Sequence, residues 1–160
     1  MKFFYLDVDG VLTDGTFLYD CNGKSHKVFG ADDSDALTIL RRYIPIEFVS
    51  ADQRGIEISR ARIERDLGFK LTLVPSGLRL NWLTQRHDLE DVIYMGDGFV
   101  DAPILKQVSI GIAPHNASPL AKQAADHVTK ASGGSGAVAE ACFYVARILG
   151  LTVSEYEGVQ

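Results

Sequence analysis

The chain has 160 residues, of which 46% are hydrophobic and 23% are charged, as is typical of a single domain with a sizeable buried core. Its formal net charge is −5 and its 16 basic residues are scattered, which argues against a surface that binds nucleic acid. We expect a soluble, cytoplasmic protein, because no apolar run is long enough to span a membrane, no signal peptide is evident and the two cysteines lie far apart.

Short apolar runs alternate with helical segments along the chain. The runs predict strands at Phe3–Asp7, Ile46–Ser50, Leu71–Val74, Val92–Met95 and Ser109–Ala113. The segments between them predict helices at Asp35–Tyr43, Gly55–Leu67, Ser76–His87, Val100–Gln107 and Pro119–Ala125. This alternation predicts a doubly wound α/β fold of the Rossmann type, in which helices cover both faces of a parallel sheet.

The end of the predicted domain is a glycine-rich turn followed by a helix. Val138, Cys142, Val145 and Leu149 share one face of that helix, which predicts that this face is buried. We expect one domain over residues 1–150 and a frayed C-terminal tail over residues 151–160. Gly133, Gly134 and Gly136 lack the preceding strand and the spacing of a dinucleotide loop, so they predict a turn, which could lie near an active site.

One stretch departs from the alternation. Thr16–Tyr19 and Ser25–Phe29 flank the sequence DCNGK, in which Asn22-Gly23 is a strong hairpin signal. We therefore expect a β-hairpin between the first strand and the first helix. This insertion is too short for a second domain, but it emerges directly beside an acidic pair.

Polar residues follow four of the predicted strands, at the edge where a parallel sheet gathers ligands. They are Asp7 and Asp9 after the first strand, Ser50 after the second, Arg79 beyond the third, and Asp97 and Asp101 after the fourth. Carboxylates gathered in a partly dry site repel one another unless a divalent cation lies between them. Mg²⁺ is the natural candidate, because it prefers oxygen ligands and binds carboxylates together with substrate phosphate.

These residue types suit phosphoryl transfer. Asp7 could act as a nucleophile that forms an aspartyl-phosphate, and Asp9 could protonate the leaving oxygen and later deprotonate the attacking water. The Ser50 hydroxyl and the Arg79 cation suit the remaining phosphate oxygens. Other interpretations stay open: an Asp-x-Asp pair can be a solvated turn, Ser50 can cap a helix, and Arg79 can be a surface residue.

The acidic residues beyond this set have less specific signals. Asp14 is expected to brace the loop that follows the first strand. Asp32, Asp33 and Asp35 either cap the helix that follows them or contact a substrate, and the sequence does not decide between these roles.

DVDGVLTDG, the Ser50 position, Arg79 and GDGFVD together resemble the haloacid dehalogenase superfamily of phosphotransferases over nearly the whole chain. The hairpin, the lack of a cap domain and ASPLAKQAADHVTKASGGSGAVAEAC resemble the capless branch that contains 3-deoxy-D-manno-octulosonate 8-phosphate phosphatase. This resemblance implies that Asp7 is the nucleophile and Asp9 the acid and base. It implies that Asp7, Asp97 and the backbone carbonyl of Asp9 bind Mg²⁺, with Asp101 in support. It further implies a homotetramer whose hairpins associate, so that a neighbouring subunit caps each site.

Three positions differ from the pattern of that branch. Arg79 stands where the superfamily usually has Lys, and Ser135 and Asp32 stand where the octulosonate phosphatases typically have Arg. The absence of a cation at Ser135 and at Asp32 weakens the case for octulosonate itself as substrate. The sequence therefore predicts a small phosphorylated sugar or sugar acid without indicating which one.

Two other functional classes were weighed against a phosphatase. A catalytically weak oligomerisation or regulatory module would share the fold, but the intact acidic motifs favour an enzyme. A phosphorelay receiver also combines acidic residues, a hydroxyl and a cation, but its phosphate-accepting Asp follows the third strand. Here the acidic pair follows the first strand, which favours turnover over storage of a phosphoryl group.

Overall fold

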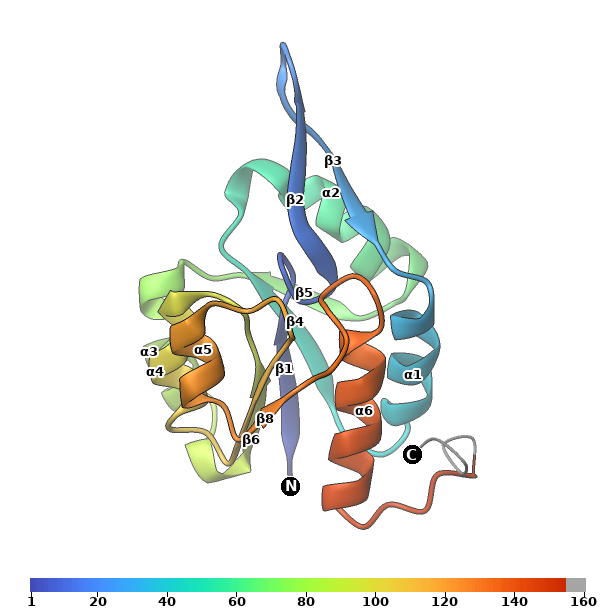
Figure 1. Cartoon of the computed structure of the whole chain (residues 1–160), viewed down its shortest axis with the longest axis vertical. Coiled ribbons are helices and arrows are strands. Elements are labelled where there is room, and N and C mark those ends of the chain that lie inside the picture. Colours follow the sequence, from blue (N-terminus) through green and yellow to red (C-terminus); the bar gives the residue numbers. More distant parts are fainter. Residues whose placement is uncertain (155–160) are drawn as a thin grey trace.

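The computed structural model describes residues 1–154, and residues 155–160 of the predicted tail lie outside the described residues. Figure 1 shows the whole chain. Six parallel strands form one sheet in the order β5-β4-β1-β6-β7-β8. The strands are β1 (Phe3–Asp7), β4 (Ile46–Ser50), β5 (Lys70–Leu73), β6 (Val92–Met95), β7 (Ile110–Ala113) and β8 (His127–Val128). The predicted doubly wound α/β fold is confirmed. The two-residue strand β8 was missed, since so short a strand has no periodicity.

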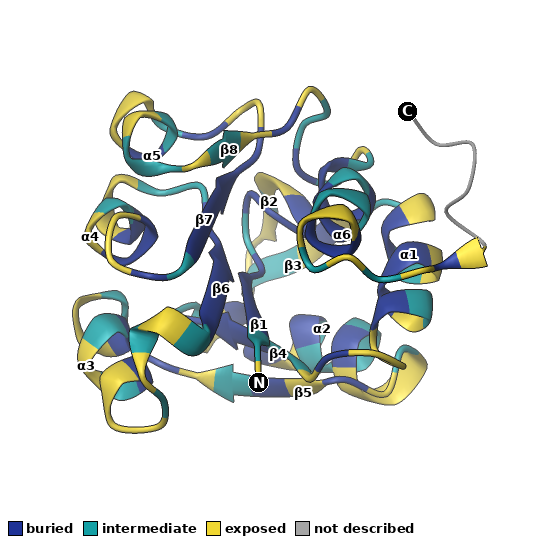
Figure 2. Ribbon diagram, turned by 90° about the horizontal axis from the view of Figure 1, so that it is seen from below, coloured by how far each residue is buried: buried dark blue, intermediate teal, exposed yellow. Residues whose placement is uncertain are grey.

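Helices cover both faces of the sheet. Those with α-helical geometry are α1 (Asp32–Leu40), α2 (Ile56–Arg60), α3 (Arg79–Thr84), α4 (Ala102–Leu105), α5 (Pro119–Ala124) and α6 (Ala137–Ile148). Single 3₁₀ turns occur at Gln53–Gly55, Ser76–Leu78, Leu89–Asp91 and Phe99–Asp101, and a π-helical segment at Ala61–Asp66 continues α2. Figure 2 shows α1, α2 and α6 on one face and α3, α4 and α5 on the other. Each face has its own apolar core.

Several helices differ in their bounds from the prediction, and the first helix is one of them. The segment expected at Asp35–Tyr43 begins at Asp32. Three carboxylates therefore lie in the first turn of α1, where they interact favourably with the helix dipole. Asp33 is fully buried and its Oδ1 accepts a hydrogen bond from the Ala139 backbone N–H at 2.9 Å. The expectation that Asp33 caps its own helix is therefore wrong, because its carboxylate binds the start of α6. That Asp32, Asp33 or Asp35 contacts a substrate stays a prediction.

A hairpin follows β1 and projects beyond the carboxyl edge of the sheet (Figure 1). Its strands, β2 (Thr13–Asp20) and β3 (Gly23–Phe29), form a separate antiparallel pair. Asp20 pairs with Gly23, so the turn consists of Cys21 and Asn22, one position earlier than the Asn-Gly signal indicates. Gly23 has a φ of 118°, a conformation that glycine adopts most easily.

The glycine-rich turn before α6 packs directly on the loop that follows β1. The Gly134 N–H donates to the Val11 carbonyl at 3.2 Å, and the Gly133 N–H donates to Asn116 Oδ1 at 2.8 Å. A Cβ atom at Gly133 would lie 2.0 Å from the Gly10 carbonyl oxygen. Glycine is therefore required here for close backbone contact, and the predicted turn lies against the acidic loop.

No helix within residues 1–154 combines the length and the apolar composition needed to cross a bilayer.

Candidate active site

Three of the predicted site residues converge where β1 and β6 pair at the centre of the sheet. Asp7 ends β1, and Asp97 and Asp101 follow β6. One carboxylate oxygen from each of these residues lies within 4.8 Å of the others. The strand order reverses at this point, where open α/β sheets typically bind ligands. The acidic cluster is therefore the candidate active site.

Arg79, the first residue of α3, has a buried side chain that contacts two carboxylates of this cluster. Its Nη1 lies 2.8 Å from Asp7 Oδ2, and its Nη2 lies 3.1 Å from Asp7 Oδ1, which is a bidentate pair. Nη1 also donates to Asp101 Oδ1 at 3.0 Å. The alternative that Arg79 is a surface residue is excluded, since its side chain is 3% exposed.

Asp101 is held by the protein through both of its carboxylate oxygens. Besides the contact with Arg79, Oδ1 accepts a hydrogen bond from the Tyr94 hydroxyl at 2.8 Å. Oδ2 accepts from the Gly98 backbone N–H at 2.9 Å. Asp101 thus fixes the position of Arg79 and of the turn that carries Asp97.

The electrostatics of the cluster fit a divalent cation. Burial raises the pKa of Asp7 to about 6, although Arg79 opposes this shift. Burial, together with the charges of Asp7 and Asp101, raises the pKa of Asp97 to about 7. The one guanidinium therefore does not compensate the three carboxylates fully. Hard oxygen donors with excess negative charge match the preference of Mg²⁺.

Asp9 is not one of these three clustered carboxylates, and it forms an ion pair with the hairpin. Lys27 Nζ is 2.7 Å from Asp9 Oδ1 and 2.8 Å from Asp52 Oδ2, and it donates to Ser59 Oγ at 2.9 Å. Lys24 Nζ lies 2.6 Å from Asp52 Oδ2. Burial raises the pKa of Asp9 despite the opposing effect of Lys27. Sequence reasoning missed both lysines and Asp52.

A β-bulge explains why the two lysines were missed. Leu18 pairs with His26, whereas Tyr19 pairs with Lys24, so Ser25 is an extra residue on β3. Residues three apart on a regular strand point to opposite faces. The bulge brings Lys24 and Lys27 to the same carboxylate, and strand periodicity gives no indication of this.

The remaining predicted residues brace the loops around the cluster. Ser50 ends β4 beside β1, and its Oγ accepts a hydrogen bond from the Asp52 N–H at 3.1 Å, so it caps the following turn. Asp14 Oδ1 accepts from the Thr16 N–H at 2.8 Å, which confirms that Asp14 braces its loop. Thr13 Oγ1 accepts hydrogen bonds from both Gly10 and Gly15.

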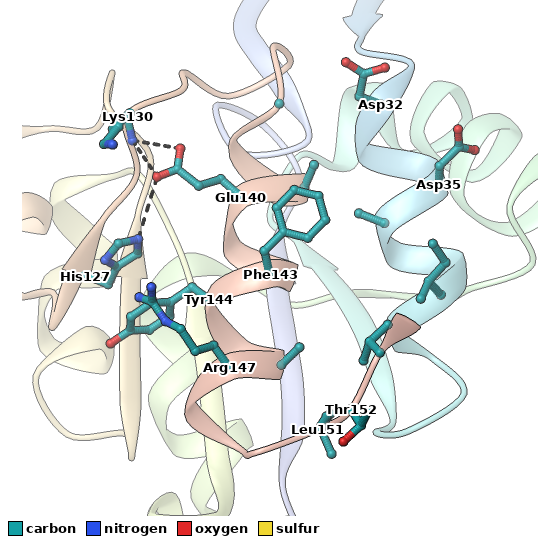
Figure 3. A pocket seen from close by; sticks show the side chains of 16 residues that line it. Asp32, Asp35, His127, Lys130, Glu140, Phe143, Tyr144, Arg147, Leu151 and Thr152 are labelled. Atoms are coloured by element: carbon teal, nitrogen blue, oxygen red, sulfur yellow. Dashed lines mark hydrogen bonds and ion pairs between the residues drawn. The ribbon is translucent and has the colours of Figure 1, made fainter. Parts of the chain in front are cut away.

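A separate groove of ≈ 970 Å³ lies between α1 and α6 (Figure 3). Asp32 and Asp35 line it, and none of the predicted site residues does. At one end the His127 ring stacks on Tyr144 with ring centroids 3.9 Å apart. Glu140 accepts hydrogen bonds from the backbone N–H groups of Lys130 and Ala131. These contacts hold β8 and the turn after it against α6.

Comparison of the sequence with known families gives a consistent result. The model of the haloacid dehalogenase-like hydrolases matches residues 79–141. The 3-deoxy-D-manno-octulosonate 8-phosphate phosphatase of Haemophilus influenzae is 36% identical over 148 residues, which cover 88% of this chain and 79% of that relative. The phosphatase of the same description from Escherichia coli K12 is 32% identical over 151 residues, covering 89% of this chain and 77% of that relative.

Solved structures of similar proteins have the same fold. The cobalt-bound deoxy-D-mannose-octulosonate 8-phosphate phosphatase of H. influenzae aligns with a TM-score of 0.84 and 31% identity, over 100% of this chain and 95% of that one. The octulosonate 8-phosphate phosphatase of Moraxella catarrhalis, in complex with magnesium, phosphate and KDO, aligns with a TM-score of 0.80 and 26% identity. That alignment covers 92% of this chain and 86% of the other.

Proposed function

The chain belongs to the haloacid dehalogenase-like hydrolases and is a magnesium-dependent phosphatase of that family, and we propose that it hydrolyses a small sugar or sugar-acid phosphate through an aspartyl-phosphate on Asp7. The observation that carries this proposal is the convergence of Asp7, Asp97 and Asp101 at the switch point of the sheet. Intact carboxylates at this position favour an enzyme over a regulatory module.

In this proposal the chain's own residues divide the chemistry between them. Asp7, Asp97 and the Asp9 carbonyl would hold Mg²⁺, which neutralises phosphoryl charge when bound. Arg79 orients the Asp7 carboxylate through its bidentate pair and favours the ionised form of that carboxylate. An Asp7 oxygen then bonds to phosphorus as the ester P–O bond breaks, and Asp9 gives its proton to the leaving oxygen.

The second half of the reaction regenerates the carboxylate. Asp9 takes a proton from a water molecule, the water oxygen bonds to phosphorus, and the Asp7–phosphorus bond breaks to release phosphate. The Ser50 hydroxyl lies at the end of the strand next to β1 and is proposed to contact a phosphoryl oxygen. Positioning and charge neutralisation are the main demands of such a displacement.

Phosphate release with and without Mg²⁺ tests this function. We expect hydrolysis of p-nitrophenyl phosphate and of sugar phosphates with Mg²⁺, and loss of activity with a chelator. Asp7→Asn should lower kcat by roughly 10⁴-fold or more, because it removes the nucleophile. Undiminished turnover in this variant contradicts the assignment of Asp7.

The proposed substrate class rests on the relatives and on two differences from them. The relatives are named for 3-deoxy-D-manno-octulosonate 8-phosphate, but this chain has Ser135 and Asp32 where that branch typically carries Arg. Lys24 and Lys27 are already paired with carboxylates. We therefore propose a related sugar or sugar-acid phosphate, to be identified by comparing kcat/KM across a panel of such esters. A preference for nucleotides contradicts this choice.

We also propose that the protein is a homotetramer in which the hairpins associate and a neighbouring subunit covers each site. Leu18, Tyr19 and Val28 support this, because these apolar residues on the projecting hairpin are at least half exposed. Sedimentation of the wild type should give a tetramer, and the double variant Leu18→Lys, Tyr19→Lys should give a smaller species. A wild-type monomer at micromolar concentration contradicts the proposal.

The cysteines support a cytoplasmic location. Cys21 is exposed on the hairpin turn and Cys142 is buried in the core, and the two are unpaired. Reduced thiols are typical of cytosolic proteins. Fractionation of cells that express the protein should recover it with the cytosolic enzymes.

A further inference from the structure

Lys27 is a buried cation that the proposed mechanism does not use. Its side chain is 0% exposed, although burial of an ammonium group is costly unless the group is paired. Its Nζ has three close partners, which are Asp9, Asp52 and Ser59. These three partners restrict the position of the Lys27 ammonium group.

Asp9 depends on this lysine for its position. Asp9 lies beyond the end of β1. Within residues 1–154, its carboxylate contacts the side chain of Lys27, in the ion pair at 2.7 Å. Lys27 is in turn fixed from the far side by Asp52 and by Ser59 of α2. The hairpin and α2 therefore both contribute to the position of the Asp9 side chain.

The close packing at Gly55 is independent evidence for the contact between Lys27 and Asp52. A Cβ atom at this position would lie 2.2 Å from Asp52 Oδ2, 2.8 Å from Lys24 Cδ and 2.9 Å from Lys27 Cε. The backbone of the turn before α2 thus packs directly against the two lysine stems. A larger residue would displace the network.

We propose that Lys27 is a positioning residue that aims the Asp9 carboxyl group at the leaving oxygen of the substrate. This inference rests on the proposed function, in which Asp9 is the acid and base. Lys27 touches Asp9 and does not need to touch the substrate. The hairpin therefore contributes to catalysis within one subunit, apart from any contact between subunits.

The dependence of the rate on the leaving group tests this role. An alkyl phosphate needs a proton on its leaving oxygen, whereas p-nitrophenolate leaves without one, so correct aiming of Asp9 matters mainly for the alkyl ester. We expect Lys27→Met to lower kcat/KM for a sugar phosphate by roughly 10- to 100-fold more than for p-nitrophenyl phosphate. Asp9→Asn should change the ratio of the two kcat/KM values in the same direction and by a larger factor.

Lys24→Met is the matched control. It removes the same charge from the same strand, but Lys24 pairs with Asp52 and not with Asp9. The ratio of the two kcat/KM values should stay within about twofold of the wild-type ratio, which is a free-energy difference of about 0.4 kcal/mol. Equal ratios in Lys27→Met and Lys24→Met overturn the proposal.

Two further measurements test the proposal in case the Lys27→Met variant folds poorly. Ser59→Ala removes one partner of Lys27 and should shift the same ratio slightly in the same direction; an unchanged ratio counts against the proposal. Crystal structures of the Lys27 and Lys24 variants provide a readout without turnover. The Asp9 carboxylate should move in the first and stay in place in the second, and an unmoved Asp9 in Lys27→Met overturns the proposal even if the wild type hydrolyses neither ester.

Discussion

Arg79 is the cation on which the buried carboxylates Asp7 and Asp101 depend. It contacts both of them, and its side chain is almost inaccessible to solvent. Removal of one partner from a buried ion pair leaves an uncompensated charge, which typically costs about 3–5 kcal/mol. The loss should be smaller where the carboxylates can take up protons instead.

We therefore expect Arg79→Met to lower the free energy of unfolding by about 3–5 kcal/mol at neutral pH in the absence of metal. Arg79→Lys should lower it less, because it keeps the charge but loses the bidentate geometry. Urea denaturation with a chelator present measures both values. A Met variant as stable as the wild type contradicts the buried pair.

Protonation of Asp97 links stability to pH and to metal. Burial and the neighbouring carboxylates raise the pKa of Asp97 in the folded chain to about 7, so the folded state binds this proton more tightly than the unfolded state. The proton stabilises the fold fully below the ordinary carboxyl pKa. This contribution is lost as the pH rises through about 7.

With Asp97 as a proposed ligand, Mg²⁺ is expected to compete with that proton and to stabilise the chain more as the pH rises. We expect the increase in Tm on adding Mg²⁺ to be larger at about pH 8 than at about pH 5. Thermal denaturation with Mg²⁺ or with a chelator measures this difference. Asp97→Asn should lose most of the Mg²⁺ effect at the higher pH, and an equal effect at both pH values contradicts Asp97 as a ligand.

Sequence reasoning located the individual carboxylates but not their partners. Asp7, Asp97 and Asp101 were predicted together because the ends of parallel strands meet at one edge, and the structure brings them together. Arg79 was expected at a phosphate, yet both of its Nη groups contact carboxylates, since packing decides the direction in which a side chain points. Its contact with a phosphoryl group remains a prediction.

At the scale of elements, the turn between β4 and α2 is shaped by the lysines of the hairpin. Gly55 has no room for a side chain because Asp52 and the stems of Lys24 and Lys27 pack against it. We expect Gly55→Ala to lower the free energy of unfolding by about 1–3 kcal/mol, as overpacking typically does. It should also lower phosphatase activity, because the network holds Asp9.

Gly77→Ala is the control for this variant. Gly77 lies in the 3₁₀ turn before α3, and a Cβ atom there would meet no heavy atom within 4 Å. Its stability should match the wild type or exceed it slightly. Urea denaturation compares the two alanine variants, and an equal loss in both contradicts the packing argument.

Elements with a clear period were predicted well, and irregular ones were not. Strands β1, β4 and β6 have the predicted bounds, since each is a short apolar run with polar residues after it. The helix predicted at Gly55–Leu67 is instead α2 followed by a π-helical segment. Neither that segment nor the bulge at Ser25 follows from periodicity, because each inserts residues into a regular pattern.

At the scale of the whole molecule, distant parts of the chain meet at the acidic loop. Gly133 packs on the Gly10 carbonyl so closely that a Cβ atom would clash with the backbone. We expect Gly133→Ala to lower both stability and phosphatase activity, with a loss of about 3 kcal/mol or more in the free energy of unfolding. Ser135→Ala, an exposed change in the same turn, should stay within about 0.5 kcal/mol of the wild type.

Urea denaturation and Mg²⁺-dependent turnover compare these two variants. An unaffected Gly133→Ala chain contradicts the close backbone contact. The fold class was predictable from the order of the elements, but this contact was not. It depends on how two loops far apart in sequence pack together, and a run of glycines does not specify its partner.

A newly translated chain can form the contact between the glycine-rich turn and the acidic loop only late in its synthesis. Asp7 leaves the ribosome early, whereas the Gly134 N–H that binds the Val11 carbonyl is synthesised after all eight strands of residues 1–154. A chain released by premature termination before residue 133 carries every carboxylate of the site but lacks both this contact and α6, which forms part of one apolar core. Such products should compete for chaperones and proteases without adding to phosphatase activity.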